Sequence, residues 1–145
     1  MLRLARRVAA RAVNPGGAPS ATTLRRAVAG RTVLDTGASH GIGRATAIRL
    51  ARAGATVLLV ARSADLLEEL AEQLRADGAA AHALPADLSD TDDAVPALAR
   101  RILSEHDPPD VIVNNAGKSI RRAVAQSFER FHDYTRTTDL NYLGP

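Results

Sequence analysis

A glycine-rich loop between a short apolar run and a helix-period segment constrains this chain more than any other feature. The stretch TGASHGIGR follows an apolar run that predicts a strand over 32–34. Gly37 permits a sharp turn off that strand, Gly41 lets a ligand approach the backbone, and Gly43 lets the next helix pack closely against the sheet. A helix N-terminus offers unpaired N–H groups and partial positive charge, so the loop predicts a phosphate-binding site. The alternative is a tight turn without a ligand.

Short apolar runs alternate with longer helix-period segments from residue 31 onward. Strands are predicted at 32–34, 56–60, 80–84 and 111–113, and helices at 42–53, between 63 and 78, around 95–102 and from 126 onward. This alternation indicates βαβ units and a parallel sheet with helices on both faces. The predicted fold class is therefore α/β, an incomplete Rossmann-type doubly wound parallel sheet of about four strands in the order 3-2-1-4.

The helices carry apolar stripes at helical spacing. The second helix is predicted to be capped by Ser63 and ended by Gly78, and to bury Leu66, Leu70 and Leu74 with Leu67 and Ala71 beside them. The third is predicted to bury Val95, Leu98, Ala99 and Ile102. Pro96 lacks an N–H and clashes one turn back, so this helix is predicted either to kink or to begin late.

The net charge of +3 is unevenly distributed. Residues 1–31 carry seven arginines and no acid, so the other 114 residues hold 12 basic groups against 16 acids. The basic character therefore indicates a basic arm on a mildly acidic domain, and nucleic-acid binding is not expected. The four histidines form no metal-ligand pair, so no metal is expected. The absence of cysteine fits a reducing compartment, which favours a cytoplasmic location.

Residues 1–30 are predicted to form a basic arm and linker. Residues 1–13 are rich in Ala and Arg and predict a short basic helix, whereas 14–23 contain Pro and Gly and predict a flexible linker. Two interpretations stay open for this arm. It resembles an organellar transit peptide or a membrane-surface segment, or else it is a solvated arm or a linker to an upstream domain.

The glycine spacing T-G-x-x-x-G-x-G resembles that of the classical short-chain dehydrogenase/reductase family. Further motifs follow in chain order: ADL at Ala86–Leu88, NNAG at Asn114–Gly117, and Asn141 in LNYLG. The resemblance covers about residues 31–145 and implies the N-terminal part of an NAD(P)-binding domain. It implies a catalytic role for Asn141 and contact between Asp87 and the adenine. The implied cofactor-binding residues are Gly37, Ser39, His40, Gly41, Ile42, Gly43, Arg62, Asp87, Leu88, Asn114, Ala116 and Gly117.

The residues after the second strand predict the choice of cofactor. An acid at that position hydrogen-bonds the ribose 2′-hydroxyl of NAD, whereas an arginine accepts the 2′-phosphate of NADP. Here Ala61 stands where the acid would be, and Arg62 follows. His40 stands where NADP-type relatives carry a basic residue. The sequence favours NADP(H) over NAD(H), and the alternative for Arg62 is a solvated surface arginine.

Carbonyl–alcohol interconversion in this family, as the resemblance implies, requires a serine and a Tyr-x-x-x-Lys pair. The only lysine, Lys118, precedes both tyrosines, and Thr138 stands four residues after Tyr134. The chain is therefore expected to be truncated before the catalytic residues, to be inactive alone and to fold poorly alone. The alternatives are a non-catalytic dinucleotide-binding fragment and a non-functional truncated gene product.

The segment after NNAG resembles short-chain reductases of long-chain acyl or fatty-aldehyde substrates. The resemblance thus implies a small-molecule carbonyl or alcohol substrate, with a fatty acyl or aldehyde compound as one candidate. It also implies a homo-oligomer for the complete protein, and the basic arm leaves contact with a membrane surface open.

Asp35 departs from the family pattern, which has an apolar residue at this strand position. Burying a carboxylate without a partner is costly and raises its pKa. Two outcomes stay open: the side chain reaches a backbone N–H in the glycine loop, or it weakens the fold.

Overall fold

The computed structural model describes residues 19–145. The predicted basic helix at 1–13 lies outside the described residues, and so does the first half of the linker, residues 14–18. None of the helices in the described range is long and apolar enough to span a membrane.

Four parallel strands form one sheet, as the sequence predicts. Their order is β3-β2-β1-β4. The strands are β1 (Thr32–Thr36), β2 (Thr56–Ala61), β3 (Ala81–Pro85) and β4 (Val111–Val113). Leu34 of β1 stands opposite Leu58 of β2 and Ile112 of β4. The carboxyl ends of β1, β2 and β4 therefore meet at one edge of the sheet.

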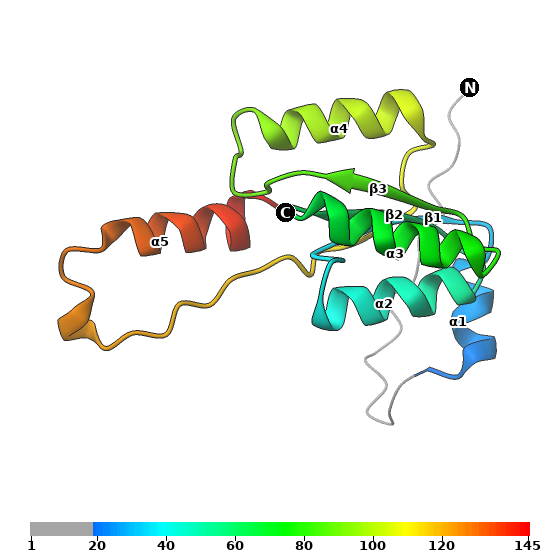
Figure 1. Ribbon diagram of the computed structural model, residues 1–145, viewed down its shortest axis with the longest axis horizontal. Coiled ribbons are helices and arrows are strands. Elements are labelled where there is room, and N and C mark those ends of the chain that lie inside the picture. Colours follow the sequence, from blue (N-terminus) through cyan, green and yellow to red (C-terminus); the bar gives the residue numbers. More distant parts are fainter. Residues whose placement is uncertain (1–18) are drawn as a thin grey trace, which may run out of the picture.

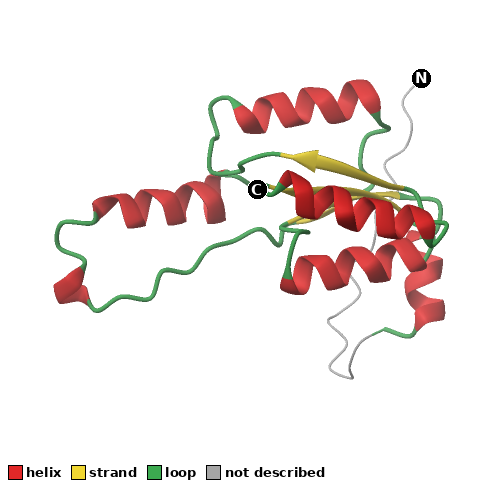
Figure 2. Ribbon diagram, viewed as in Figure 1, coloured by secondary structure: helices red, strands yellow, loops and turns green. Residues whose placement is uncertain are grey.

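Helices cover both faces of the sheet. In Figures 1 and 2, α2 and α3 lie on one side and α4 on the other, while α5 projects beyond the sheet. The helices are α1 (Ala21–Val28), α2 (Gly41–Arg52), α3 (Ala64–Ala76), α4 (Ala94–Glu105) and α5 (Phe131–Thr138), with a 3₁₀ turn η1 (Val124–Gln126) and a π turn η2 (Asp139–Leu143). This arrangement of three layers, with the sheet between two layers of helices, confirms the Rossmann-type class.

Each face of the sheet has its own apolar core. Val33, Val57 and Leu59 point to the side of α2 and α3, where Leu67 and Leu70 meet them. Leu58, Val60 and Leu84 point to the side of α4, where they meet Leu98 and Ile102. Residues of β2 alternate between the two cores and are buried on both faces, which explains why TVLLV reads as one unbroken apolar run.

Several predicted details are wrong. Leu66 is 37% exposed, and Leu67 takes its place in the buried stripe of α3. Ala99 of α4 is exposed, whereas Leu98 and Ile102 of that helix are buried and Val95 packs against the same core partly buried.

The start of α4 explains how Pro96 is accommodated. The helix begins at Ala94, earlier than predicted, so Pro96 lies in its first turn. N–H groups in that turn have no partner within the helix, so a missing N–H is tolerated. The next N–H, of Ala97, donates to the Asp93 carbonyl at 3.0 Å.

Boundaries near both ends also differ from the predictions. The linker does not extend to residue 23, because α1 begins at Ala21 and the Ser20 hydroxyl accepts the Thr23 N–H at 3.2 Å. The helix predicted from 126 onward begins only at Phe131, after the short 3₁₀ turn.

Asp35 is fully buried in the middle of β1, between Leu59 of β2 and Val113 of β4. Neither carboxylate oxygen has a hydrogen-bond partner among the described residues, so the side chain does not reach the glycine loop. Burial raises the pKa of Asp35 to about 7. The position therefore carries an uncompensated polar group within the core.

Candidate functional site

The glycine loop connects the end of β1 to the start of α2 at the carboxyl edge of the sheet. The N–H groups of Gly37 and Ala38 both donate to the Val60 carbonyl, at 2.8 and 3.1 Å, so the loop begins tied to β2. Gly37 and Gly41 have positive φ angles of 75° and 54°, which side chains rarely adopt. The N–H groups at the start of α2 have no partner within the helix and are directed towards the loop.

The three glycines are required for two different reasons. A Cβ on Gly37 would lie 2.7 Å from the Asn115 side-chain nitrogen, and one on Gly43 would lie 2.6 Å from the same atom. A Cβ on Gly41 would meet no atom within 4 Å. Gly37 and Gly43 thus allow close packing within the protein, whereas Gly41 faces open space and leaves room for a ligand. The positive φ of Gly37 fits the sharp turn predicted there, and the close contacts at Gly43 fit the packing predicted for it, whereas the approach of a ligand to Gly41 stays a prediction.

Thr36 and Asn115 join the ends of β1 and β4. The Thr36 hydroxyl donates to the Val113 carbonyl at 3.1 Å and accepts the N–H groups of Asn115 and Ala116, both at 3.0 Å. The Asn115 side-chain N–H donates to the Thr36 carbonyl at 2.9 Å. These bonds fix the NNAG segment beside the glycine loop. Sequence reasoning missed both residues, although each adjoins a residue that it selected.

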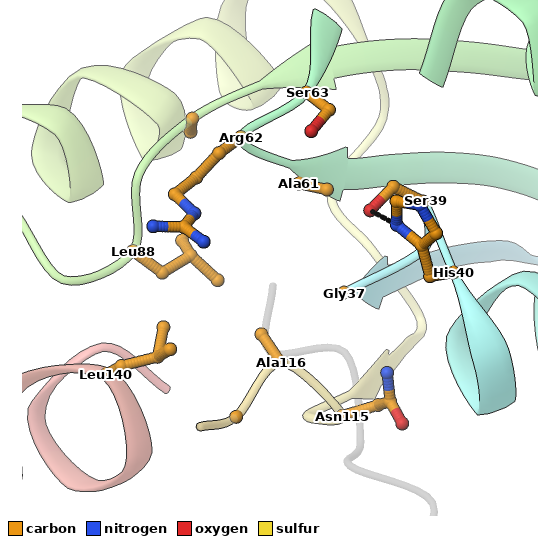
Figure 3. A pocket seen from close by; sticks show the side chains of 12 residues that line it. Gly37, Ser39, His40, Ala61, Arg62, Ser63, Leu88, Asn115, Ala116 and Leu140 are labelled. Carbon is orange, nitrogen blue, oxygen red and sulfur yellow. Dashed lines mark hydrogen bonds between the residues drawn. The ribbon is translucent and has the colours of Figure 1, made fainter. Parts of the chain in front are cut away.

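A cavity of about 370 Å³ opens between the loop and the ends of β2, β3 and β4 (Figure 3). It is lined by Gly37, Ser39, His40, Ala61, Arg62, Ser63, Ala86, Leu88, Asn115, Ala116, Gly117 and Leu140. Seven of the residues selected from the sequence are in this lining. The other cofactor-binding candidates do not line the cavity: Gly41, Asp87 and Asn114 adjoin lining residues in the chain, and Ile42 and Gly43 follow Gly41 in α2.

Charged and polar groups surround the cavity. Arg62 is exposed, and Figure 3 shows its side chain extending across the cavity towards Leu88. His40 precedes α2, and its Nδ1 lies 3.0 Å from the Ser39 hydroxyl. The Ser89 hydroxyl and N–H donate to Asp87 at 2.7 and 3.0 Å. The Ser89 hydroxyl contributes most to lowering the pKa of Asp87, and Arg62 adds to it, so this carboxylate stays ionised.

Asn141 lies apart from this cavity, in the π turn that follows α5. Its side-chain oxygen accepts the Lys118 N–H and its side-chain nitrogen donates to the Lys118 carbonyl, both at 2.8 Å. The Asn141 amide therefore pairs with both the N–H and the carbonyl of Lys118, in the way that the backbone of a neighbouring strand would. These bonds hold the segment after NNAG against the π turn.

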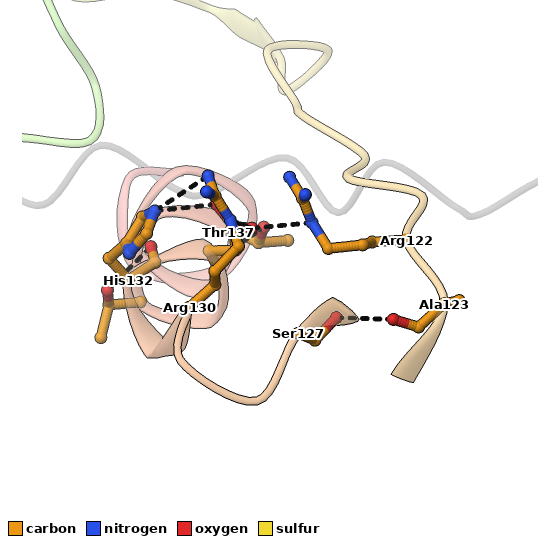
Figure 4. Close-up of polar contacts among 8 residues, drawn as sticks. Arg122, Ala123, Ser127, Arg130, His132 and Thr137 are labelled. Carbon is orange, nitrogen blue, oxygen red and sulfur yellow. Dashed lines mark hydrogen bonds and ion pairs between the residues drawn. The ribbon is translucent and has the colours of Figure 1, made fainter. Parts of the chain in front are cut away.

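Asp133 of α5 lies within ion-pair distance of three basic side chains, those of Arg122, Arg130 and His132, which Figure 4 labels. Arg130 donates to its carboxylate at 3.0 Å, Arg122 lies 3.4 Å away, and His132 lies 3.3 Å away. The Arg130 hydrogen bond contributes most to lowering the pKa of Asp133. Arg122 connects the extended segment to α5. Within the described residues, no group of three or more potential ligands could hold a metal ion.

Comparison with known proteins identifies relatives of this chain. The sequence model of the family described as short chain dehydrogenase matches residues 31–145. The chain is 48% identical over 124 residues to an uncharacterized oxidoreductase of Mycobacterium bovis, covering 83% of this chain and 36% of that protein. It is 49% identical over 120 residues to a fatty acyl-CoA reductase of Acinetobacter baylyi, covering 83% of this chain and 40% of that protein.

Solved structures share the fold. A metagenomic short-chain oxidoreductase in complex with NADP has a TM-score of 0.74 and 33% identity, covering 81% of this chain and 52% of that one. L-sorbose reductase from Gluconobacter frateurii, complexed with NADPH and L-sorbose, has a TM-score of 0.74 and 28% identity, covering 81% and 44%. The chain spans about two-fifths of the length of the curated relatives described above. With its glycine loop, its strand order and this family match, the chain belongs to the short chain dehydrogenase family.

Proposed function

We propose that this chain is the dinucleotide-binding part of an NADP(H)-dependent oxidoreductase that interconverts a carbonyl and an alcohol. The observation that carries this proposal is the open space in front of Gly41, at the start of α2 and beside the cavity. A diphosphate fits there, because free N–H groups and the helix dipole favour an anion. The metagenomic oxidoreductase and the L-sorbose reductase described above, which are complexed with NADP and NADPH, support the same cofactor class.

The described residues fit such a cofactor. The N–H groups of Gly41, Ile42 and Gly43 would hold the diphosphate, with Ser39 and His40 beside it. Asp87 and Leu88 would border the adenine, and the remaining candidates, Asn114, Ala116 and Gly117, would border the opposite side of the cavity. When bound, NADPH supplies the hydride.

Arg62 is proposed to select NADP(H). Its guanidinium is exposed at the cavity, and no carboxylate lies within ion-pair distance of it among the described residues. Charge-assisted hydrogen bonds to a 2′-phosphate are stronger than bonds between neutral groups. Ala61 offers no carboxylate to bind the 2′-hydroxyl of NAD or to repel the phosphate.

Turnover is not expected from these 145 residues. Protonation of a carbonyl by a tyrosine requires a neighbouring cation that lowers the tyrosine pKa, and the sequence contains no Tyr-x-x-x-Lys pair. Asn141 is proposed to act by holding the segment at Lys118 in place. In this proposal the chain supplies cofactor binding and does not supply the tyrosine–lysine pair.

The proposed substrate of the complete protein is a long-chain fatty acyl or fatty aldehyde compound. The relative named a fatty acyl-CoA reductase supports this class, being 49% identical over the shared part. By family resemblance, the complete protein is proposed to be a cytoplasmic homo-oligomer.

Calorimetric titration with NADPH, followed by an oxidation assay with long-chain aldehydes and acyl-CoA esters, tests the proposal. We expect saturable binding of one NADPH per chain and no oxidation above the rate without protein. A folded chain that binds no dinucleotide would contradict the proposal. Steady oxidation would contradict only the assignment of catalysis to other residues.

A further inference from the structure

A basic groove lies between α1 and the C-terminal end of α2. It has a volume of about 570 Å³, and Arg25, Arg49 and Arg52 line it. Leu24 of α1 and the buried Ala53 form part of its apolar lining. Figure 1 shows α1 at the end of the sheet opposite α5. None of the residues that line this groove lines the cavity proposed to hold the dinucleotide.

The three arginines have no acidic partner. Among residues 19–145, no carboxylate lies within 4.0 Å of their guanidinium groups. Residues 1–18 contain no acid, so they supply no carboxylate either. Asp77 shares a separate hollow with Arg52 but lies beyond ion-pair distance.

The charge around the groove extends beyond these three residues. Residues 1–64 contain eleven arginines and a single acid, Asp35, which is fully buried on β1. Arg26 and Arg31, which lie close in the sequence to the groove residue Arg25, are also exposed. Arg49 and Arg52 are favourable at the C-terminal end of α2 because of the helix dipole, but the dipole does not account for Arg25, which comes from another helix.

We propose that the basic groove formed by Arg25, Arg49 and Arg52 docks the chain on an anionic phospholipid surface. A guanidinium binds phosphate oxygens through paired hydrogen bonds, and an acidic bilayer attracts arginines within a Debye length. An enclosed pocket would suit a single small phosphate compound. The charge here is spread over two helices around an open, partly apolar groove, which favours a lipid surface. This inference does not depend on the proposed dinucleotide site.

The test is sedimentation of the full chain with vesicles of phosphatidylglycerol and phosphatidylcholine, compared with vesicles of phosphatidylcholine alone. The double variant Arg49→Gln/Arg52→Gln is compared with Arg100→Gln/Arg101→Gln, which removes the same charge from α4. Each arginine near an acidic surface strengthens binding by about fivefold, so the groove variant should bind about 25-fold more weakly. The α4 variant should bind as the unaltered chain does, and added salt should weaken binding.

Three further variants separate the contribution of the groove from that of the arm and from misfolding. Arg49→Lys/Arg52→Lys keeps the charge and should retain most of the binding, whereas Arg25→Gln alone should lose about fivefold. Replacing Arg3, Arg6, Arg7 and Arg11 with Gln should leave a groove-dependent component. The proposal is overturned if the groove and α4 variants bind equally, or if the arm variant removes all binding. It is also overturned if the chain ignores acidic vesicles, or if inorganic phosphate displaces it from them at matched ionic strength.

Discussion

At the scale of single residues, Asp35 is the clearest conflict between sequence and fold. Its carboxylate is fully buried without a partner, and its pKa is raised to about 7 in the folded protein. The unfolded chain keeps an ordinary value near 4, so the folded state binds more protons between these values. Asp35 is therefore protonated and does not weaken the fold through its charge below about pH 4. As the pH rises from 4 towards 7, its ionisation lowers the free energy of unfolding.

Replacing Asp35 with Val should remove this pH dependence. Three pKa units correspond to about 4 kcal/mol, so the gain in unfolding free energy over the parent should grow by up to that amount between pH 4 and pH 7. Urea unfolding at both pH values measures it, with the exposed Asp92→Asn as control. A constant gain at both pH values would show that Asp35 is paired in solution.

Gly41 offers a prediction that separates ligand binding from backbone strain. Gly41 and Gly78 both have positive φ angles and open space where a Cβ would lie. Replacing either with Ala should cost about 1 kcal/mol of unfolding free energy, because alanine is strained in that conformation. Only Gly41→Ala should weaken NADPH binding, by tenfold or more, because only Gly41 adjoins the dinucleotide cavity.

Thermal unfolding and NADPH titration of the two glycine variants provide the comparison. Equal losses of affinity in both would mean that strain, and not proximity to a bound diphosphate, governs binding.

At the scale of elements, the Thr36 hydroxyl joins the ends of β1 and β4. Thr36→Val keeps the shape but leaves the Asn115 and Ala116 N–H groups without their acceptor. We expect a loss of about 1–3 kcal/mol of unfolding free energy, and Thr36→Ser should recover most of it. Chemical denaturation of both variants measures this. A valine variant as stable as the parent would mean that water replaces the hydroxyl at this position.

Some features of the strands and helices can be predicted from the sequence, and others cannot. The order of the strands followed from the alternation of runs such as TVLLV with amphipathic segments, because parallel strands and crossovers leave few topologies. The sequence does not predict the start of α1, because Ser20 follows a stretch that contains Pro and Gly. Only the structure shows the capping bond, in which the Ser20 hydroxyl accepts the Thr23 N–H. The Thr36–Asn115 bonds join residues about 79 positions apart, and no local pattern encodes them.

At the scale of the whole molecule, the two ends of the sheet carry different chemistry. The carboxyl edge holds the loop, the cavity and Arg62, and the groove of Arg25, Arg49 and Arg52 lies at the other end. The sequence motifs predicted the site at the carboxyl edge, because each motif marks the end of a strand in a known topology. They did not predict the groove, because α1 and the end of α2 meet only in three dimensions.

The central claim is that this chain binds NADP(H) through the glycine loop and Arg62. Its most direct test is calorimetric titration of NADPH and NADH against the parent chain and Arg62→Asp, with Arg100→Gln as a control for lost surface charge. The parent and the control should bind NADPH at least tenfold more tightly than NADH, because only NADPH presents a 2′-phosphate to Arg62. Arg62→Asp should abolish or reverse that preference. Equal affinities for both cofactors in the parent, or an unchanged preference in Arg62→Asp, would contradict the account.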